Sequence, residues 1–230
     1  TDELGVRYST FTYDSFGSAV ATELAGGVNR WSIATVAGPK LRVTDPRGYS
    51  SDRTFVELHG VTKLATSTQP CPSCGASGAA SAATYDLNGN LASSTDFRGK
   101  KTCYAYDTAR NLETSRLEGA TSAEVCSTVL ATPPNRPDVR KVTTTWHTTR
   151  RLPATIVEPA PGGTKTTAFT YDASGNLTQK KITAPRNDGT STTMTRTWKW
   201  TYGSFGRVLT ATDPNNKVTT TTYHSDSAPD

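Results

Sequence analysis

Residues that could carry chemistry are sparse in this 230-residue sequence, and their spacing matches no catalytic motif. His59, His147 and His224 show neither the H-E-x-x-H nor the H-x-x-x-H spacing that places two metal ligands on one helix face. No G-x-S-x-G nucleophile motif occurs. About a third of the 20 acidic residues occupy turn positions, where backbone N–H groups engage the carboxylate and lower its pKa. We therefore expect no catalytic residues, no cofactor and no enzyme activity.

The four cysteines leave three alternatives open. Cys71 and Cys74 form a C-x-x-C, and with Cys103 and Cys126 they could supply a Cys₄ zinc site, although the second pair lacks close spacing. A thioredoxin-like redox role requires a helix after the C-x-x-C, and residues 75–78 (GASG) predict a loop. The favoured interpretation is two disulfides, Cys71–Cys74 and Cys103–Cys126, formed in an oxidising compartment. It predicts no bound metal and a secreted or cell-surface protein.

An aromatic residue recurs with Asn or Arg five positions later and Leu or Val six positions later. Tyr85, Tyr106, Trp146, Tyr171 and Tyr202 start such units, and Tyr13 starts a weaker sixth. A longer unit of about 21 residues also appears, because an Asp lies at +11 and a Tyr at +21 from two of these aromatics. The residues that define the repeat are Tyr13, Asp14, Gly17, Tyr85, Asp86, Gly89, Asn90, Asp96, Gly99, Tyr106, Asp107, Trp146, Tyr171, Asp172, Gly175, Asn176, Tyr202, Asp213 and Tyr223.

The segment after Tyr13, Tyr85 and Tyr171 is Asp-x-x-Gly, the pattern of a type I turn that ends in a left-handed residue. Its Asp is expected to accept backbone N–H groups, and its Gly to take a positive φ. The pattern occurs at 14–17, 45–48, 86–89, 96–99 and 172–175, with 213–216 as an Asn-ended variant. His147 and His224 follow an aromatic where the repeat has Asp, so we expect them to replace Asp in the turn.

Short runs rich in Thr, Val and aromatics separate the turns and predict strands. The runs are 100–106, 141–146, 164–171, 194–202 and 217–223, and in two of them rings alternate with Thr or Lys, so one sheet face should carry the rings. No stretch of useful length has helical periodicity, and only residues 21–29 are left unassigned. The sequence predicts an all-β fold of antiparallel hairpins in one continuous region, 1–230, with loop insertions near 69–83, 127–140, 158–163 and 184–190.

The segment Y-D-L-N-G-N-L at 85–91, followed by D-F-R-G at 96–99 and Y-A-Y-D at 104–107, resembles the RHS/YD-repeat family of bacterial proteins. The resemblance extends over roughly residues 8 to 224. It implies a curved or spiralling antiparallel sheet, part of the hollow shell found in polymorphic toxins and insecticidal toxin complexes. The implied role is a non-catalytic scaffold that encloses or presents a toxin or other cargo. The implied partners are the rest of the parent polypeptide and its C-terminal cargo.

Exposed rings support an alternative function, a carbohydrate- or protein-binding module in surface adhesion. Sugars could stack on the rings of Trp31, Trp146, Trp198, Trp200 and Tyr202, although these rings could equally cover the sheet. Nucleic acid is not an expected partner, because the basic residues behind the net charge of +5 do not cluster. Membrane insertion is not expected either, because no stretch approaches 20 apolar residues.

Overall fold

The computed structural model describes residues 4–5, 7–69, 79–186 and 192–224. The chain forms two compact units. The first comprises Thr1–Cys103 and Gly119–Cys126, and the second comprises Tyr104–Glu118 and Ser127–Asp230. No helix among the described residues is long and apolar enough to cross a membrane.

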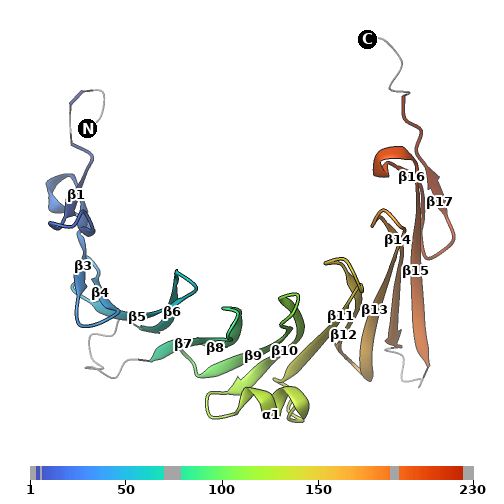
Figure 1. The fold of residues 1–230 in the computed structure, drawn as a ribbon, viewed down its shortest axis with the longest axis horizontal. Coiled ribbons are helices and arrows are strands. Elements are labelled where there is room, and N and C mark those ends of the chain that lie inside the picture. Colours follow the sequence, from blue (N-terminus) through green and yellow to red (C-terminus); the bar gives the residue numbers. More distant parts are fainter. Residues whose placement is uncertain (1–3, 6, 70–78, 187–191, 225–230) are drawn as a thin grey trace. The chain divides into compact units, whose positions relative to one another are not determined.

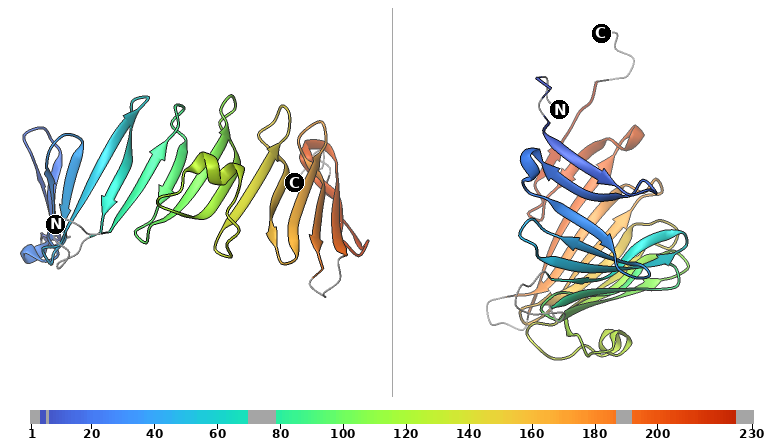
Figure 2. Two further views of the ribbon diagram at one scale, coloured as in Figure 1. Left: turned by 90° about the horizontal axis from the view of Figure 1, so that it is seen from below. Right: turned by 90° about the vertical axis from the view of Figure 1, so that its left-hand side faces the viewer.

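The described chain folds into a 17-stranded antiparallel sheet, as the all-β prediction requires. Each strand pairs with the next one along the chain (Figures 1 and 2). The first ten strands are β1 Ser9–Tyr13, β2 Ala19–Leu24, β3 Trp31–Thr35, β4 Lys40–Thr44, β5 Ser50–Leu58, β6 Val61–Thr68, β7 Ala80–Tyr85, β8 Leu91–Thr95, β9 Lys100–Asp107 and β10 Leu112–Thr121. The last seven are β11 Arg140–Trp146, β12 Pro153–Ala160, β13 Gly163–Tyr171, β14 Leu177–Pro185, β15 Thr193–Tyr202, β16 Val208–Thr212 and β17 Val218–Thr220.

Segments 126–131 and 158–163 differ from the sequence-based expectation, and the structure also resolves the stretch 21–29 that was left open. Residues 126–131 form a short helix, α1 Cys126–Ala131, where a loop was expected over 127–140. Strands β12 and β13 continue into 158–163, so a two-residue turn replaces the expected loop insertion. Pro159 is tolerated in β12, although proline cannot donate to a ladder hydrogen bond. Residues 21–29 contain the end of β2 and a 3₁₀ turn, Ala25–Gly27.

A β-bulge falls at the repeat aromatic in successive hairpins. The register shifts between Thr84 and Tyr85, so that Tyr85 pairs with Leu91, six residues later. The same shift and the same +6 partner occur at Tyr171 and Tyr202. Tyr13 follows the rule as well, because it pairs with Ala19 at +6. The offset seen in the sequence is therefore the geometry of a five-residue hairpin loop that begins with a bulge.

The two faces of the sheet from β13 to β16 carry different side chains, aromatic rings on one face and threonines on the other. On one face, the register aligns Phe169, Lys180 and Trp198. On the other face, threonines pair across strands, as in Thr201 and Thr210, whose hydroxyl oxygens lie 2.6 Å apart. The expected alternation of rings and threonines in β13 and β15 is confirmed. We call the second side of the sheet the threonine face.

Full burial is rare in this single sheet and is concentrated near α1. In the second unit, Leu117 is fully buried, and Val129 and Val142 are nearly so. Lys141 on β11 donates its Nζ to the Leu130 carbonyl at 2.5 Å, which holds α1 over the sheet. The helix thus supplies apolar cover that the strands lack elsewhere in the described chain.

In the first unit, an ion-pair cluster joins β4 and β5 across the sheet. Arg42 donates to both carboxylate oxygens of its cross-strand partner Asp52, at 2.7 and 3.0 Å, and Lys40 Nζ lies 2.8 Å from Oδ2. These hydrogen bonds from Arg42, and then from Lys40, hold the pKa of Asp52 far below its usual range. Folding therefore stabilises the ionised form of Asp52, and protonation of Asp52 in acid should weaken the ion-pair cluster.

We expect Asp52→Asn to lower the free energy of unfolding by about 1 kcal/mol at pH 7. A carboxyl group whose pKa is depressed on folding contributes its stability above the unfolded pKa and loses it as the pH falls. The difference between wild type and variant should therefore shrink below about pH 4. Urea unfolding at pH 7 and pH 2 measures both values, and a gap that is unchanged at pH 2 would contradict the assignment.

Candidate functional site

The Asp-x-x-Gly turns have the predicted geometry. At Asp172, Oδ1 accepts hydrogen bonds from the N–H groups of Ser174 and Asn176, both at 2.9 Å, and Gly175 takes a φ of 93°. The Asn176 side chain also donates to Asp172 Oδ2 at 2.9 Å, which explains the Asn at +5. The same two backbone contacts recur at the other five turns, which begin at Asp14, Asp45, Asp86, Asp96 and Asp213.

Two of these turn carboxylates have shifted acidities. At Asp172, hydrogen bonds from the Asn176 side chain and from backbone N–H groups lower the pKa. At Asp86, burial acts to raise the pKa, but hydrogen bonds from Asn90 and from backbone N–H groups outweigh it and lower the pKa. A carboxyl group with a lowered pKa is a poor proton donor near neutral pH. These aspartates are therefore committed to holding the turn.

His147 takes the place of Asp in its turn, as the sequence predicts. The ring Nδ1 of His147 accepts from the backbone N–H groups of Thr149 and Arg150 at 3.2 and 3.3 Å. The backbone N–H of His147 donates to the Leu152 carbonyl. His224, the second such histidine, stands at the end of the described residues, and its turn falls outside them. His59 lies in another hairpin turn, where its Nε2 is 2.8 Å from the Leu87 carbonyl oxygen.

The repeat aromatics tie each hairpin to the preceding one. Tyr171 donates its hydroxyl to the carbonyl of Pro153, and Tyr202 donates to that of Leu177, at 2.9 and 2.7 Å. Each acceptor is the residue that pairs with the preceding repeat's aromatic across its own hairpin. Burial raises the pKa of both hydroxyl groups, so they stay protonated donors at neutral pH. Equivalent bonds run from Tyr85 to Leu64, from Trp146 Nε1 to Glu113 and from Tyr223 to Val208.

Two arginines at +4 of the repeat, Arg110 and Arg150, tie their turns to the following turn, and neither role was predicted from the sequence. Arg110 donates to the carbonyls of His147 and Arg150, at 2.9 and 2.6 Å. Arg150, at the same repeat position, donates to the carbonyls of Asp172 and Ala173. The sequence feature that marks these two arginines is an Arg at the +4 position, where other repeats have Gly. We call these contacts, together with the aromatic ones, the inter-repeat ties.

The Arg150 tie passes directly against Gly175. A Cβ atom on Gly175 would lie 3.3 Å from Arg150 Nε. The positive φ of Gly175 is also unfavourable for any residue with an L side chain. We expect Gly175→Ala to cost about 2 kcal/mol of unfolding free energy, part of it from strain and part from displacing the tie. The matched control is Gly17→Ala, the same turn position with no atom within 4 Å of the added Cβ.

Urea unfolding of both variants, each repeated with Arg150→Ala, separates the two contributions. The excess cost of Gly175→Ala over Gly17→Ala should disappear when Arg150 is absent. An excess that survives the removal of Arg150 would show that the tie does not constrain the turn.

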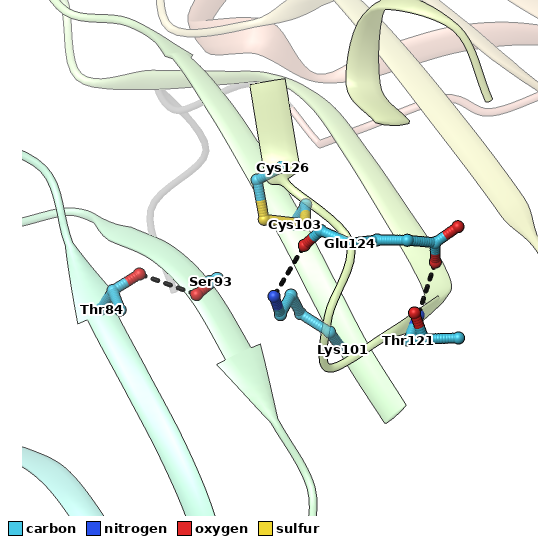
Figure 3. Close-up of a disulfide and its surroundings, with 7 residues drawn as sticks. All are labelled: Thr84, Ser93, Lys101, Cys103, Thr121, Glu124 and Cys126. Carbon is cyan, nitrogen blue, oxygen red and sulfur yellow. Dashed lines mark hydrogen bonds between the residues drawn. A yellow bond between two sulfur atoms is a disulfide. The ribbon is translucent and has the colours of Figure 1, made fainter. Parts of the chain in front are cut away.

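The disulfide between Cys103 and Cys126 is present, as expected (Figure 3). It joins β9 to the start of α1, with Cα atoms 5.3 Å apart. Beside it, Lys101 Nζ donates to the Glu124 carbonyl at 2.7 Å, and the Thr121 N–H donates to Glu124 Oε2 at 2.6 Å. Cys71 and Cys74 lie outside the described residues. Among those that are described, no group of three His, Cys, Asp or Glu side chains could hold a metal ion.

Among the described residues, two of the five candidate sugar-stacking rings, Trp198 and Trp200, line the same hollow. Trp146 and Tyr202 use their polar atoms in inter-repeat ties. Trp31 is 45% exposed in the first unit, whereas the other four rings belong to the second. Trp198 and Trp200 line a shallow hollow of about 320 Å³ with Ala211, Asp213, Lys217 and Thr219. Lys180 Nζ stands 5.5 Å from the centre of the Trp198 ring, within cation–π range.

Comparisons with known proteins support the fold. No protein-family model and no curated protein sequence matches this chain. The crystal structure of TcdB2-TccC3-Cdc42 contains a chain that matches 94% of this one with a TM-score of 0.61 and 17% identity. A second crystal structure, of TcdB2-TccC3-TEV, matches 94% with a TM-score of 0.39 and 11% identity. This chain spans about a tenth of the length of the first matched chain. At this level of identity the likeness establishes the sheet architecture.

Proposed function

We propose that this chain is a non-catalytic scaffold segment of a larger RHS-type protein, whose sheet helps to form a shell around a toxin or other cargo. The inter-repeat ties carry the proposal. The conspicuous polar groups of the repeat, such as the Tyr171 hydroxyl and the Arg150 guanidinium, bind the backbone of a neighbouring repeat. Groups used in this way extend and stiffen a sheet and leave little for catalysis.

Two further considerations support this role. The matched crystal structure contains a chain about ten times as long, as expected if this chain is one part of a longer run of strands. The Cys103–Cys126 disulfide fits a protein exported to an oxidising compartment, in keeping with a secreted or surface location. The proposed partners are the remainder of the parent polypeptide and the cargo that follows it.

Limited proteolysis of the full-length parent polypeptide tests the proposal. Trypsin should leave the segment that follows the repeats intact, because an enclosing sheet keeps the protease out. The double variant Arg110→Ala/Arg150→Ala removes two inter-repeat ties and should accelerate cleavage of that segment. A segment cleaved as fast in the intact parent as in isolation would show that no shell encloses it.

A second candidate function is sugar binding at the Trp198–Trp200 hollow. Indole rings beside the Asp213 carboxylate and the Lys217 ammonium offer a stacking surface with polar neighbours. A glycan array should then give hits that Trp198→Ala/Trp200→Ala abolishes and that Trp31→Ala retains. An array without hits would end this candidate and leave the scaffold role untouched.

A further inference from the structure

The threonine face of the second unit contains a polar groove of about 460 Å³ on β14, β15 and β16 and on the turn that follows β16. Gln179, Lys181, Thr197 and Lys199 form its base, with Thr195, Thr212, Asp213, Pro214 and Asn216 around them. The groove lies on the opposite face from Lys180 and Trp198, because side chains alternate along a strand. It shares Thr212 and Asp213 with the aromatic hollow and includes the turn that begins at Asp213, but its two lysines lie on the opposite face of the sheet from Trp198.

Two lysines stand diagonally across the groove. Gln179 pairs with Lys199, and Lys181 pairs with Thr197, two positions along the same pair of strands. Side chains in such a diagonal arrangement remain within reach of one group placed between them. Within the described part of the chain, neither lysine forms an ion pair. Two like charges without a counter-ion repel each other, and a bound anion would relieve that repulsion.

The charge of the groove limits which anion fits. Asp213 brings one carboxylate, whose Oδ1 accepts the N–H groups of Asn215 and Lys217 at 2.8 Å each. Two ammonium groups and one carboxylate leave a net charge of +1 at neutral pH. This matches a singly charged oxyanion better than a doubly charged one, because the carboxylate repels additional negative charge. A sulfate ester carries one negative charge at neutral pH, whereas a phosphate monoester carries nearly two.

The remaining lining groups suit a ligand rich in hydroxyls. Thr195, Thr197 and Thr212 bring hydroxyl groups that both donate and accept hydrogen bonds, and Gln179 and Asn216 bring carboxamides. We propose that this groove binds a sulfate ester carried by a hydroxyl-rich molecule, with the sulfate between Lys181 and Lys199. This is a recognition role in addition to the scaffold role, and it does not depend on it.

Titration of the ¹⁵N-labelled chain with glucose 6-sulfate, observed by NMR, tests the proposal. Chemical shifts should move in β14–β16, and Lys181→Gln and Lys199→Gln should each weaken binding by about threefold to tenfold, since each removes one close charge. Lys180→Gln is the matched control, because it removes the same charge on the neighbouring position of the opposite face. It should change the affinity by less than about twofold, because the remaining interaction is screened by salt.

Three further probes define the outcome. Glucose alone should not bind, and glucose 6-phosphate should bind more weakly than glucose 6-sulfate at pH 8. Inorganic sulfate should also bind more weakly, because it lacks the ligand hydroxyls. If Lys180→Gln lowered the affinity as much as Lys181→Gln or Lys199→Gln, binding would reflect only the overall positive charge, and the proposal would be overturned. Equal affinity for inorganic sulfate and glucose 6-sulfate would overturn it as well, as would the absence of shifts in β14–β16.

Discussion

Removal of the Cys103–Cys126 disulfide is expected to lower the free energy of unfolding by about 3 kcal/mol. The two cysteines are 23 residues apart in sequence. A disulfide that closes a loop of this length lowers the entropy of the unfolded chain, which stabilises the fold by about 3 kcal/mol. Cys103 is fully buried, so alanine is the suitable replacement, because serine would bury an additional hydroxyl group. Urea unfolding of Cys103→Ala/Cys126→Ala, compared with wild type under oxidising conditions, measures the loss.

The control uses the other two cysteines. In a Cys71→Ala/Cys74→Ala background, added reductant acts on the Cys103–Cys126 bond alone, and it should reproduce most of the loss seen in the double alanine variant. A change below about 1 kcal/mol under both conditions would mean that α1 and the 119–126 segment are held without the bond, and the prediction would be wrong.

The second large effect is expected at Leu117, the largest fully buried side chain among the described residues. Leu117→Ala should cost about 3 kcal/mol, because it removes buried methyl groups and leaves a cavity that the surroundings fill only in part. A single sheet with one short helix has few other apolar contacts to compensate. Urea unfolding measures the cost, and hydrogen exchange should show faster opening of β10 and β11 in the variant.

Leu87→Ala is the matched control for the same chemical change. Leu87 is 93% exposed at the tip of its turn, so its truncation should change the free energy of unfolding by less than about 0.5 kcal/mol. Similar costs at the two positions would show that burial near α1 does not stabilise the fold.

The strands and turns could be predicted because their signals are local. Asp172 captures N–H groups two and four residues away, and a Gly at position 175 permits the left-handed exit. Both requirements are visible within five residues of sequence. The helix at 126–131 could not be predicted in the same way. It is too short for helical periodicity, and it is held by contacts such as Lys141 to Leu130 that form only after folding.

The inter-repeat ties also escaped prediction, since their two ends lie far apart in sequence. Arg110 and the carbonyl of Arg150 are 40 residues apart, and the sequence shows only that Arg replaces Gly at +4. The role of that exchange depends on the distance between consecutive turns, which the sheet register determines. The same holds for the polar groove, whose lysines meet only because β14 and β15 pair in one particular register.

The repeat, the Asp-x-x-Gly turns and the all-β fold could therefore be predicted, because each depends on local conformation. The Cys103–Cys126 disulfide was the favoured one of three alternatives for the cysteines. The tertiary structure was needed to show which polar groups join one repeat to the next and which are left to contact a ligand. Those choices depend on cross-strand neighbours, and a shift of one residue in register would exchange the two faces of every strand. For this chain, the conspicuous residues of the repeat hold the sheet together, and the recognition site that we propose lies among the threonines and lysines between them.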